Sequence, residues 1–564
     1  MIVGIDLGTT NSLIGAFVDG SSVLFRNALG DLLTPSVVSV DDRGGILVGR
    51  AARDRLVTHP NRSVAAFKRW MGSAREVQLG DHRFRPEELS ALVLRTLLAD
   101  AEAALGYKIG QAVISVPAYF SDAQRKATRA AGELAGIKVE RLINEPTAAA
   151  LAYGLQERRD GSRFLVFDLG GGTFDVSILE MFGGVVEVHA SAGDNFLGGE
   201  DFLEMLIDAC AIDLKFDPKA LLPGELGQLR HRIERAKVDL STTASARVEL
   251  SLGGKSLSWE IEEERFSRIA EPLVQRLRAP LERAMRDARL QSSQLDEVVL
   301  VGGASRMPLV ARTVSRMFGR LPLRHVNPDQ AIALGASIAA GLKARDARLE
   351  EVILTDVCPY TLGTEVSRPN QDGKPVAGFF HPIIPRNSTV PVSREDHFSP
   401  IADEQTRMNI QVFQGESPLV ARNIKLGQLA VPIPPAKPGV NRDVVVRFTY
   451  DINGILQVEV CVAATGKRFE LILEQNPGTL SSEEIQRRFA ELERIKIHPR
   501  DQQENLAVIA RAERFYEEYL DLREHIQQML ARFRGALETQ DDRLVAELRR
   551  QFTKALDDME KGSS

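Results

Sequence analysis

Two short glycine-rich motifs combine a carboxylate, small residues and hydroxyl groups, a combination that suits the binding of phosphate. The first runs Asp6-Leu-Gly-Thr-Thr, and the second runs Asp168-Leu-Gly-Gly-Gly-Thr. Glycine lets backbone N–H groups approach an anion closely, threonine hydroxyls can donate to phosphate oxygens, and a carboxylate can hold a hydrated Mg²⁺ ion. Each motif therefore predicts a turn that grips the phosphates of a nucleotide.

Apolar segments that are typical of strands end at the two motifs. The strand patterns cover 2–7, 111–116, 163–168 and 297–301, and helical patterns cover 86–105, 121–135, 229–240 and 262–290. Strands that alternate with helices indicate an α/β fold, which we expect up to about residue 345. Because the motif occurs twice at a domain-sized separation, we predict two similar lobes that face each other across the two turns.

A single glycine-rich turn is more often an ordinary turn than a phosphate site. Here the motif occurs twice, and Thr173-Phe-Asp175 adds a hydroxyl and a second carboxylate to the later copy. The pair of motifs therefore favours phosphate binding.

The sequence beyond residue 345 has a different character. A charged stretch leads into the short apolar segment 352–356, which is typical either of a linker or of an ordinary strand. Residues 357–477 show β-branched alternation interrupted by Pro and Gly, which predicts an antiparallel β domain. From Ser481 the apolar residues recur on one helical face, as at 485, 489, 492 and 495, which predicts a small helical bundle.

The composition argues against several classes of protein. The chain has 564 residues and a net charge of −6, unlike a protein whose affinity depends on neutralising nucleic-acid phosphates. Its three cysteines are widely separated, which predicts neither a disulfide framework nor a zinc site. The longest apolar run, 331–342, is too short for a membrane span, and the amino-terminal residues are not typical of a secretory signal. We therefore expect a soluble cytoplasmic protein that binds neither nucleic acid nor membranes.

Six motifs resemble, in order along the chain, the signatures of the seventy-kilodalton heat-shock chaperones of the DnaK type. They are Gly4-Ile-Asp-Leu-Gly-Thr-Thr-Asn-Ser12, Val116-Pro-Ala-Tyr-Phe-Ser-Asp-Ala-Gln-Arg125, Ile143-Asn-Glu-Pro-Thr-Ala-Ala149, Asp168-Leu-Gly-Gly-Gly-Thr-Phe-Asp175, Gly198-Gly-Glu-Asp-Phe202 and Val301-Gly-Gly-Ala-Ser-Arg-Met-Pro308. The likeness covers nearly the whole chain. Within that family, the short helical tail and the altered β domain are most similar to the bacterial HscC branch.

The resemblance implies a fold and a function. It implies a duplicated actin/hexokinase-like α/β ATPase domain at 1–345, a linker at 346–356, an antiparallel β-sandwich substrate-binding domain at 357–477 and an α-helical lid at 478–564. Such a protein is an ATP-dependent chaperone of the stress response that binds and releases extended hydrophobic segments of unfolded proteins. Its cofactors would be ATP or ADP, Mg²⁺ and K⁺, and its partners would be client polypeptides, a J-domain co-chaperone and a nucleotide-exchange factor.

Two other functions remain open at this point. Small-molecule kinases share the duplicated phosphate turns, and so do polymerising ATPases of the actin type. Neither function gives residues 357–564 a task, which favours the chaperone.

The resemblance also implies roles for single residues. Three carboxylates would position Mg²⁺, potassium ions and the attacking water, namely Asp6, Asp168 and Asp175. Lys68 would stabilise charge that develops on the γ-phosphate, and Glu145 would act with it near the water. Thr173 would contact the γ-phosphate.

The other implied nucleotide ligands form two groups. The phosphates would lie against Gly8, Thr9, Thr10, Asn11, Gly170, Gly171, Gly172, Gly198 and Gly199. Adenosine would lie against Glu234, Lys237, Ser241, Gly302, Gly303, Arg306 and Asp329. Three departures from the family pattern, at Val238, at Ala304 and at Asn195-Phe196, predict altered nucleotide affinity and an altered γ-phosphate loop.

A third group of residues would connect nucleotide state to client binding. Pro117 and Arg125 would relay that state, and Leu354 in the linker would transmit it. A J-domain would engage Arg141, Asn144, Thr147 and Asp356.

The peptide pocket implied by the resemblance has an unusual lining. It would be formed by Thr364, Phe398, Met408 and Ile410, with Ile401 arching over the peptide. Met408 stands where general chaperones tend to carry valine, and Thr364 stands where they carry an aliphatic residue. A larger and more polar lining predicts a narrower range of clients.

Overall fold

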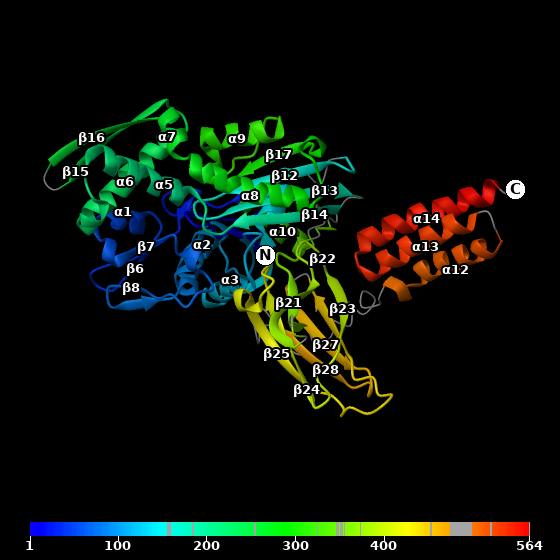
Figure 1. The fold of residues 1–564 in the computed structure, drawn as a ribbon. Coiled ribbons are helices and arrows are strands. Elements are labelled where there is room, and N and C mark those ends of the chain that lie inside the picture. Colours follow the sequence, from blue (N-terminus) through cyan, green and yellow to red (C-terminus); the bar gives the residue numbers. More distant parts are fainter. Residues whose placement is uncertain are drawn as a thin grey trace. The chain divides into compact units, whose positions relative to one another are not determined.

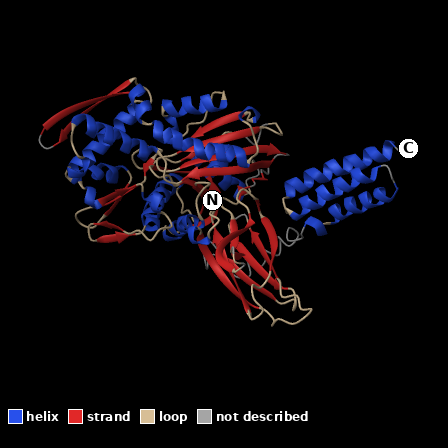
Figure 2. Cartoon of the chain, in the orientation of Figure 1, coloured by secondary structure: helices blue, strands red, loops and turns tan. Residues whose placement is uncertain are grey.

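The computed structural model describes the chain apart from residues 155–158, 183–184, 253–254, 324, 346–348, 350–352, 355, 371, 373, 452–453, 474–498, 519–521 and 563–564. It divides into two compact units. The first comprises Met1–Tyr360 with Arg386–Val390, and the second comprises Thr361–Pro385 with Pro391–Ser564. The first unit combines sheets and helices, whereas the second has a β part followed by helices (Figures 1 and 2).

The first central sheet carries the first glycine-rich motif. Its strand order is β11-β10-β1-β2-β3, with β1 at Ile2–Asp6, β2 at Asn11–Val18, β3 at Ser21–Leu24, β10 at Gln111–Val116 and β11 at Lys138–Asn144. Strand β1 lies antiparallel to β2 and parallel to β10, which is parallel to β11. The motif forms the β1–β2 turn.

The second central sheet repeats these relations around the second motif. Its strand order is β17-β12-β13-β14-β18, with β12 at Arg163–Leu169, β13 at Phe174–Phe182, β14 at Val185–Asp194, β17 at Glu297–Val301 and β18 at Ile353–Leu354. Strand β12 lies antiparallel to β13 and parallel to β17. Because the second motif forms the β12–β13 turn, the two motifs occupy equivalent places in equivalent sheets.

Helices cover the sheets and form three hydrophobic cores. The helices of this unit are α1 (Arg50–Thr58), α2 (Pro86–Leu105), α3 (Asp122–Leu134), α4 (Glu145–Ala152), α5 (Gly199–Leu214), α6 (Pro223–Asp239), α7 (Glu263–Ile269), α8 (Glu271–Asp287), α9 (Pro308–Phe318) and α10 (Ala331–Lys343). Helices α2 and α3 pack on the first sheet, and α5, α6, α8 and α9 pack on the second. Helices α4 and α10 share the third core with strands of both sheets.

Small strands complete the first unit. They are β4 (Thr34–Pro35), β5 (Val37–Val40), β6 (Ile46–Val48), β7 (Ser63–Ala65), β8 (Val77–Leu79), β9 (His82–Phe84), β15 (Ser245–Leu252) and β16 (Lys255–Glu262). Most of them pair with sequence neighbours as short antiparallel ribbons.

Close backbone contacts fix α4 and α10 against each other and against β1. A Cβ atom on Gly335 of α10 would lie 1.7 Å from the carbonyl oxygen of Ala148 of α4. A Cβ atom on Gly4 of β1 would lie 2.2 Å from the backbone nitrogen of Ser337. Glycine at both positions lets the backbones touch, which places the end of β1 and the start of α4 side by side.

Two predicted helices differ from the observed ones. The segment 262–290 forms α7 and α8 instead of one helix, because Pro272 has no N–H group to continue the hydrogen-bond ladder from α7. Helix α6 begins at Pro223, before the predicted start at 229. Proline is favoured in the first turn, and the Glu225 carboxylate accepts the N–H of Leu222 at 3.0 Å.

The β part of the second unit contains two four-stranded antiparallel sheets, as the alternation predicted. The first has the order β21-β20-β24-β25, with β20 at Leu362–Pro369, β21 at Pro375–Ile384, β24 at Arg407–Gln414 and β25 at Ile424–Pro432. The second has the order β23-β26-β27-β28, with β23 at Val392–Phe398, β26 at Val444–Tyr450, β27 at Leu456–Val462 and β28 at Arg468–Leu473. Alternate residues such as Val446, Phe448, Val458 and Val460 are fully buried.

The helical tail of the second unit forms its own core. It contains α12 (Gln503–Glu518), α13 (Arg523–Glu538) and α14 (Asp542–Gly562). Phe515, Phe533 and Phe552, one from each helix, are buried together. The predicted start at Ser481 and the apolar face 485–495 lie outside the described residues.

The joint between the units forms short strands within the first unit. Residues Ile353 and Leu354 pair in parallel with Val185 and Val186 of β14. Strand β19 (Asp356–Val357) pairs with β22 (Thr389–Val390). The described residues of the segment, 353, 354 and 356, are therefore in strands, and the side chain of Leu354 lies outside the described residues.

Two expectations about composition can be compared with the structure. All three cysteines are free in the structure. Among the described helices, none is both long and apolar enough to cross a membrane.

We expect Gly335→Ala to lower the free energy of unfolding of the full chain by about 1–3 kcal/mol, because the added methyl group must push α4 away from α10. Denaturant unfolding would measure the change. Gly110→Ala is the matched control, because a Cβ atom at Gly110 would meet nothing within 4 Å. Equal losses of stability in the two variants would contradict the prediction.

Candidate active site

Four carboxylates and one ammonium group meet in a buried cluster where the two central sheets end. Asp6 ends β1, Asp168 lies opposite Asp175 on the β12–β13 pair, and Glu145 begins α4. Each of these side chains interacts electrostatically with Lys68. All five residues are at most 7% exposed, and the Nζ atom of Lys68 donates to Oε1 of Glu145 at 2.8 Å.

Burial dominates the electrostatics of this cluster. It raises the pKa of Asp6 and the pKa of Asp175 to about 7, and the charge of Glu145 adds to both increases. Burial, followed by Glu145 and the two other aspartates, raises the pKa of Asp168 well above its usual value. For Lys68 burial alone would lower the pKa, but the Glu145 and Asp6 carboxylates raise it, so the ammonium group stays charged.

The cluster suits an additional cation. Among the described residues, Asp168 and Asp175 each keep one buried carboxylate oxygen, Oδ2, without a hydrogen-bond partner. The other carboxylate oxygen of Asp175 accepts the N–H of Tyr119 at 2.9 Å, and Oδ1 of Asp6 accepts the hydroxyl of Ser115 at 2.9 Å. Unpaired buried carboxylates are unfavourable, so a cation would relieve their charge.

The available carboxylates suit Mg²⁺ better than a metal ion that takes all its ligands from protein side chains. No three His, Cys, Asp or Glu side chains within the described part of the chain are arranged to hold a metal by themselves. Mg²⁺ commonly binds one or two carboxylates while it keeps waters and substrate phosphate oxygens as its other ligands. The aspartates of the cluster can supply that part of the coordination.

The two glycine-rich turns lie face to face. A Cβ atom on Gly171 would lie 1.8 Å from Oγ1 of Thr10, and one on Gly172 would lie 2.7 Å from Cγ2 of Thr9. The first turn is itself tight, because a Cβ atom on Gly8 would lie 2.1 Å from a backbone oxygen. The predicted approach of the two motifs is therefore present in the structure.

The Gly198-Gly199 turn packs against the second motif. The N–H of Gly199 donates to the carbonyl of Gly170 at 2.9 Å, and a Cβ atom on Gly198 would lie 2.5 Å from the nitrogen of Gly172. Gly170 in turn donates to the carbonyl of Thr173 at 3.0 Å. These contacts form a backbone cradle, and at Gly198 they leave no room for a side chain larger than hydrogen.

The first two residues assigned to adenosine lie beside this cradle. Lys237 of α6 donates to the carbonyl of Gly199 at 2.8 Å and forms an ion pair with Glu234 at 2.7 Å. A Cβ atom on Gly199 would lie 3.3 Å from Cβ of Ala304, so the 302–304 loop also reaches the cradle. Ser241 follows α6, where its N–H donates to the carbonyl of Val238.

The remaining residues assigned to adenosine form a second cluster. Arg306 pairs with Asp329 at 2.7 Å, and a Cβ atom on Gly303 would lie 2.7 Å from Oδ1 of Asp329. A Cβ atom on Gly302 would lie 2.6 Å from Oδ1 of Asp168. The loop after β17 therefore connects this cluster to the buried carboxylates.

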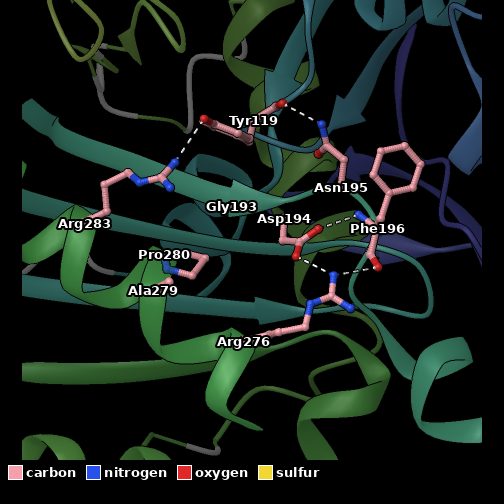
Figure 3. Close-up of a pocket in the computed structure, with 9 residues that line it drawn as sticks. All are labelled: Tyr119, Gly193, Asp194, Asn195, Phe196, Arg276, Ala279, Pro280 and Arg283. Atoms are coloured by element: carbon pink, nitrogen blue, oxygen red, sulfur yellow. Dashed lines mark hydrogen bonds and ion pairs between the residues drawn. The ribbon is translucent and has the colours of Figure 1, made fainter. Parts of the chain in front are cut away.

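A cavity of about 410 Å³ adjoins Asp175 (Figure 3). Its lining residues are Tyr119, Gly193, Asp194, Asn195, Phe196, Arg276, Ala279, Pro280 and Arg283. A Cβ atom on Gly193 would lie 3.2 Å from Oδ1 of Asp175. The family departure Asn195-Phe196 lies in this cavity, where Asn195 donates to the carbonyl of Tyr119 at 3.1 Å and Phe196 is 62% exposed.

The residues assigned to relay and to J-domain binding also meet. Asn144 donates to Asp356, and Arg125 donates to Oδ1 of Asn144 at 2.7 Å. Burial raises the pKa of Asp356, and Arg125 and Arg141 partly oppose that increase. Arg125 also donates to the carbonyls of Ala118 and Phe120, just after Pro117.

Three of the five predicted peptide-lining residues share one face of a sheet in the second unit. Met408, Ile410 and Val412 are two residues apart along β24, so their side chains point to the same side of the sheet. Thr364 lies directly opposite Val412 on the neighbouring strand and therefore points to that side as well. Phe398 ends β23, where its ring packs edge-on against His381, and Ile401 is 56% exposed in the following loop.

The predicted polarity of this face needs a correction. The hydroxyl of Thr364 donates to the carbonyl of Gln411 at 2.9 Å. It already has a partner and presents no unmet hydrogen bond to a peptide. The volume of Met408 is then the remaining reason to expect a narrow range of clients.

Sequence reasoning missed several residues that hold the site together. Arg69 donates to the carbonyl of Gly172 at 3.1 Å and pairs with Asp201 at 2.7 Å, so it joins the two lobes. Asp201 lies inside a quoted motif and Arg69 follows the predicted Lys68, so their opposite charges could have drawn attention. Tyr119 lies inside a quoted motif and Ser115 precedes it, but neither is charged, and their contacts with Asp6 and Asp175 depend on the fold.

Comparison with known proteins agrees with this arrangement. The family model described as "Hsp70 protein" matches residues 2–78 and 73–564. The chain is similar to the chaperone protein DnaK of Thermotoga neapolitana, with 42% identity over 97% of this chain and 92% of the relative. It is 41% identical to the chaperone protein DnaK of Thermotoga petrophila and of Thermotoga maritima, over the same shares. The chain therefore belongs to the Hsp70 family of ATP-dependent chaperones, which are ATPases.

Proposed function

We propose that ATP binds between the two glycine-rich turns and is hydrolysed at the buried carboxylate cluster. The observation that carries this proposal is the convergence of Asp6, Asp168, Asp175, Glu145 and the charged Lys68 beside two glycine-rich turns that approach each other closely. Sensitivity of single-turnover hydrolysis to substitution of these residues tests it.

Each group has a task that follows from its position. Lys68, held by Glu145, stabilises negative charge that grows on the γ-phosphate. Thr173, at 7% exposure, donates its hydroxyl to the same phosphate, and the aspartates orient water. Bound Mg²⁺ supplies charge neutralisation at the phosphate oxygens.

The unpartnered oxygens of Asp168 and Asp175 support the binding of K⁺ beside Mg²⁺. Lys237, Glu234 and Ser241 hold adenosine from the α6 side. On the β17 side, adenosine is held by Gly302, Gly303, Arg306 and Asp329. The α6 group borders the Gly198-Gly199 cradle through Lys237, and the β17 group borders Asp168 through Gly302.

We propose that nucleotide state reaches the second unit through the joint. Asn144 supports this route, because it contacts both Asp356 and Arg125 and directly precedes Glu145 in the sequence. A J-domain co-chaperone engages the same surface, at Arg141, Asn144, Thr147 and Asp356. A nucleotide-exchange factor completes the cycle.

We propose that the second unit binds extended hydrophobic segments of client proteins. Its two antiparallel sheets support a β-sandwich substrate-binding domain at 357–477, and the three-helix core supports an α-helical lid within 478–564. The ATPase domain then comprises 1–345 and the linker 346–356, in a cytoplasmic protein. Membership of the HscC branch stays a prediction, because the relatives compared are DnaK proteins.

A kinase or a polymerising ATPase would use the same turns. The family match extends through both units, which supports the chaperone over these alternatives.

We expect Lys68→Ala and Thr173→Ala to retain ATP binding and to slow hydrolysis. The backbone cradle still holds the phosphates, whereas the loss of one transition-state contact typically costs about 10²- to 10³-fold in rate. Single-turnover hydrolysis at saturating ATP is the measurement. Lys108→Ala is a matched control, because the Lys108 side chain is 92% exposed. A wild-type rate in Lys68→Ala would remove that residue from the mechanism.

We expect Leu354→Asp to leave basal ATP hydrolysis near normal and to abolish its stimulation by peptide and a J-domain protein. Residue 354 extends the second central sheet, and a carboxylate is unfavourable at a segment that must dock an apolar side chain. Steady-state ATPase rates with and without the two partners test this, with Leu354→Met as the conservative control. Intact stimulation in the aspartate variant would show that this segment is not the relay.

We expect Met408→Val to broaden the range of bound peptides. Met408 is 8% exposed on the face it shares with Ile410. Because valine is smaller than methionine, the substitution leaves more space for a peptide side chain on this packed face. A peptide array compared between wild type and variant measures breadth and affinity. Unchanged breadth would mean that the flexible methionine re-packs around its ligands.

A further inference from the structure

Tyr119 lines the cavity in Figure 3 and contacts Asp175 directly. Its backbone N–H donates to Oδ1 of Asp175 at 2.9 Å, and its carbonyl accepts from Asn195 at 3.1 Å. Its phenol oxygen accepts from Arg283 at 3.3 Å, as the dashed line in Figure 3 shows. The backbone position of Tyr119 therefore fixes one oxygen of a carboxylate in the buried cluster.

Tyr360 adds two contacts to Tyr119 from the other end of the first unit. The ring centroids of the two tyrosines are 4.6 Å apart, and the hydroxyl of Tyr360 donates to the carbonyl of Tyr119 at 2.9 Å. Burial raises the pKa of Tyr360 above its usual value, so the hydroxyl remains a donor at neutral pH. Together these contacts restrain the loop that holds Asp175.

Tyr360 is also the last residue of the first unit, and Thr361 begins the second. The N–H and the hydroxyl of Thr361 donate to the carboxylate of Glu416, at 2.8 and 3.0 Å. Its carbonyl accepts from Gly415 at 3.0 Å. Tyr360 therefore directly precedes a residue that is anchored in the β part of the second unit.

We propose that Tyr360 is a positioning residue for ATP hydrolysis, which acts through Tyr119 to orient Asp175 in the carboxylate cluster. The inference rests on the proposed role of Asp175 at the metal side of the site. Tyr360 needs no contact with the nucleotide for this role. Its removal affects the hydrolysis step and the Tyr119 loop, and leaves the phosphate cradle unchanged.

The first experiment compares Tyr360→Leu, Tyr360→Phe and wild type in the full chain. Hydrogen–deuterium exchange reports the amides of residues 118–120, and single-turnover hydrolysis reports the chemical step. We expect Tyr360→Leu to exchange faster at these amides and to hydrolyse ATP about fivefold more slowly, the effect of one net hydrogen bond. Tyr360→Phe keeps the ring contact and should recover part of both properties, while the Kd for ATP stays the same.

Two further variants make the outcomes distinct. Tyr107→Leu is the matched control, because that tyrosine is 44% exposed and should change neither exchange nor rate. Asp175→Asn tests the underlying role: a wild-type rate there would overturn the assignment of Asp175 and, with it, the route proposed for Tyr360. Slow hydrolysis in Asp175→Asn together with unchanged exchange and rate in Tyr360→Leu would overturn the positioning role alone.

Discussion

The burial of four carboxylates around one lysine is the constraint on which the nucleotide site depends. Each carboxylate is buried away from bulk water, and among the described residues only Glu145 of the four forms a direct ion pair with the Lys68 ammonium group. The raised pKa values of Asp6 and Asp175 express that cost. A site of this kind gains stability when it binds cations and the phosphates that accompany them, so the mutual repulsion of the buried carboxylates favours the nucleotide-bound state.

Such a cluster forms only if several elements end at one point, and close glycine contacts bring this about. Gly4 and Gly335 let β1, α4 and α10 touch through their backbones, which sets Asp6 beside Glu145. Gly171 and Gly172 let the second turn meet Thr9 and Thr10 of the first. Larger residues at these places would push the lobes apart and increase the distances between the charged groups that would bind Mg²⁺ and phosphate. The packing of small residues therefore sets the electrostatics.

The sequence predicted most reliably what depends on local spacing. The paired turns could be found because glycine, aspartate and threonine recur at fixed intervals, and the bounds of α2 follow from Pro86 and a regular apolar stripe. Contacts between distant segments could not be found this way. Nothing near Tyr119 shows that its N–H binds Asp175, and nothing near Thr364 shows that its hydroxyl is satisfied by Gln411. The division of 262–290 into two helices was visible in Pro272, but the apolar periodicity on both sides concealed it.

Two hydrogen-bonded routes lead from the end of the first unit to different members of the cluster. One runs from Asp356 to Asn144, whose neighbour Glu145 holds Lys68. The other runs from Tyr360 through Tyr119 to Asp175. The described residues 356 and 360, only four positions apart, are therefore tied by separate hydrogen bonds toward the lysine-bound glutamate and toward Asp175, so one short segment of the first unit restrains two different members of the cluster.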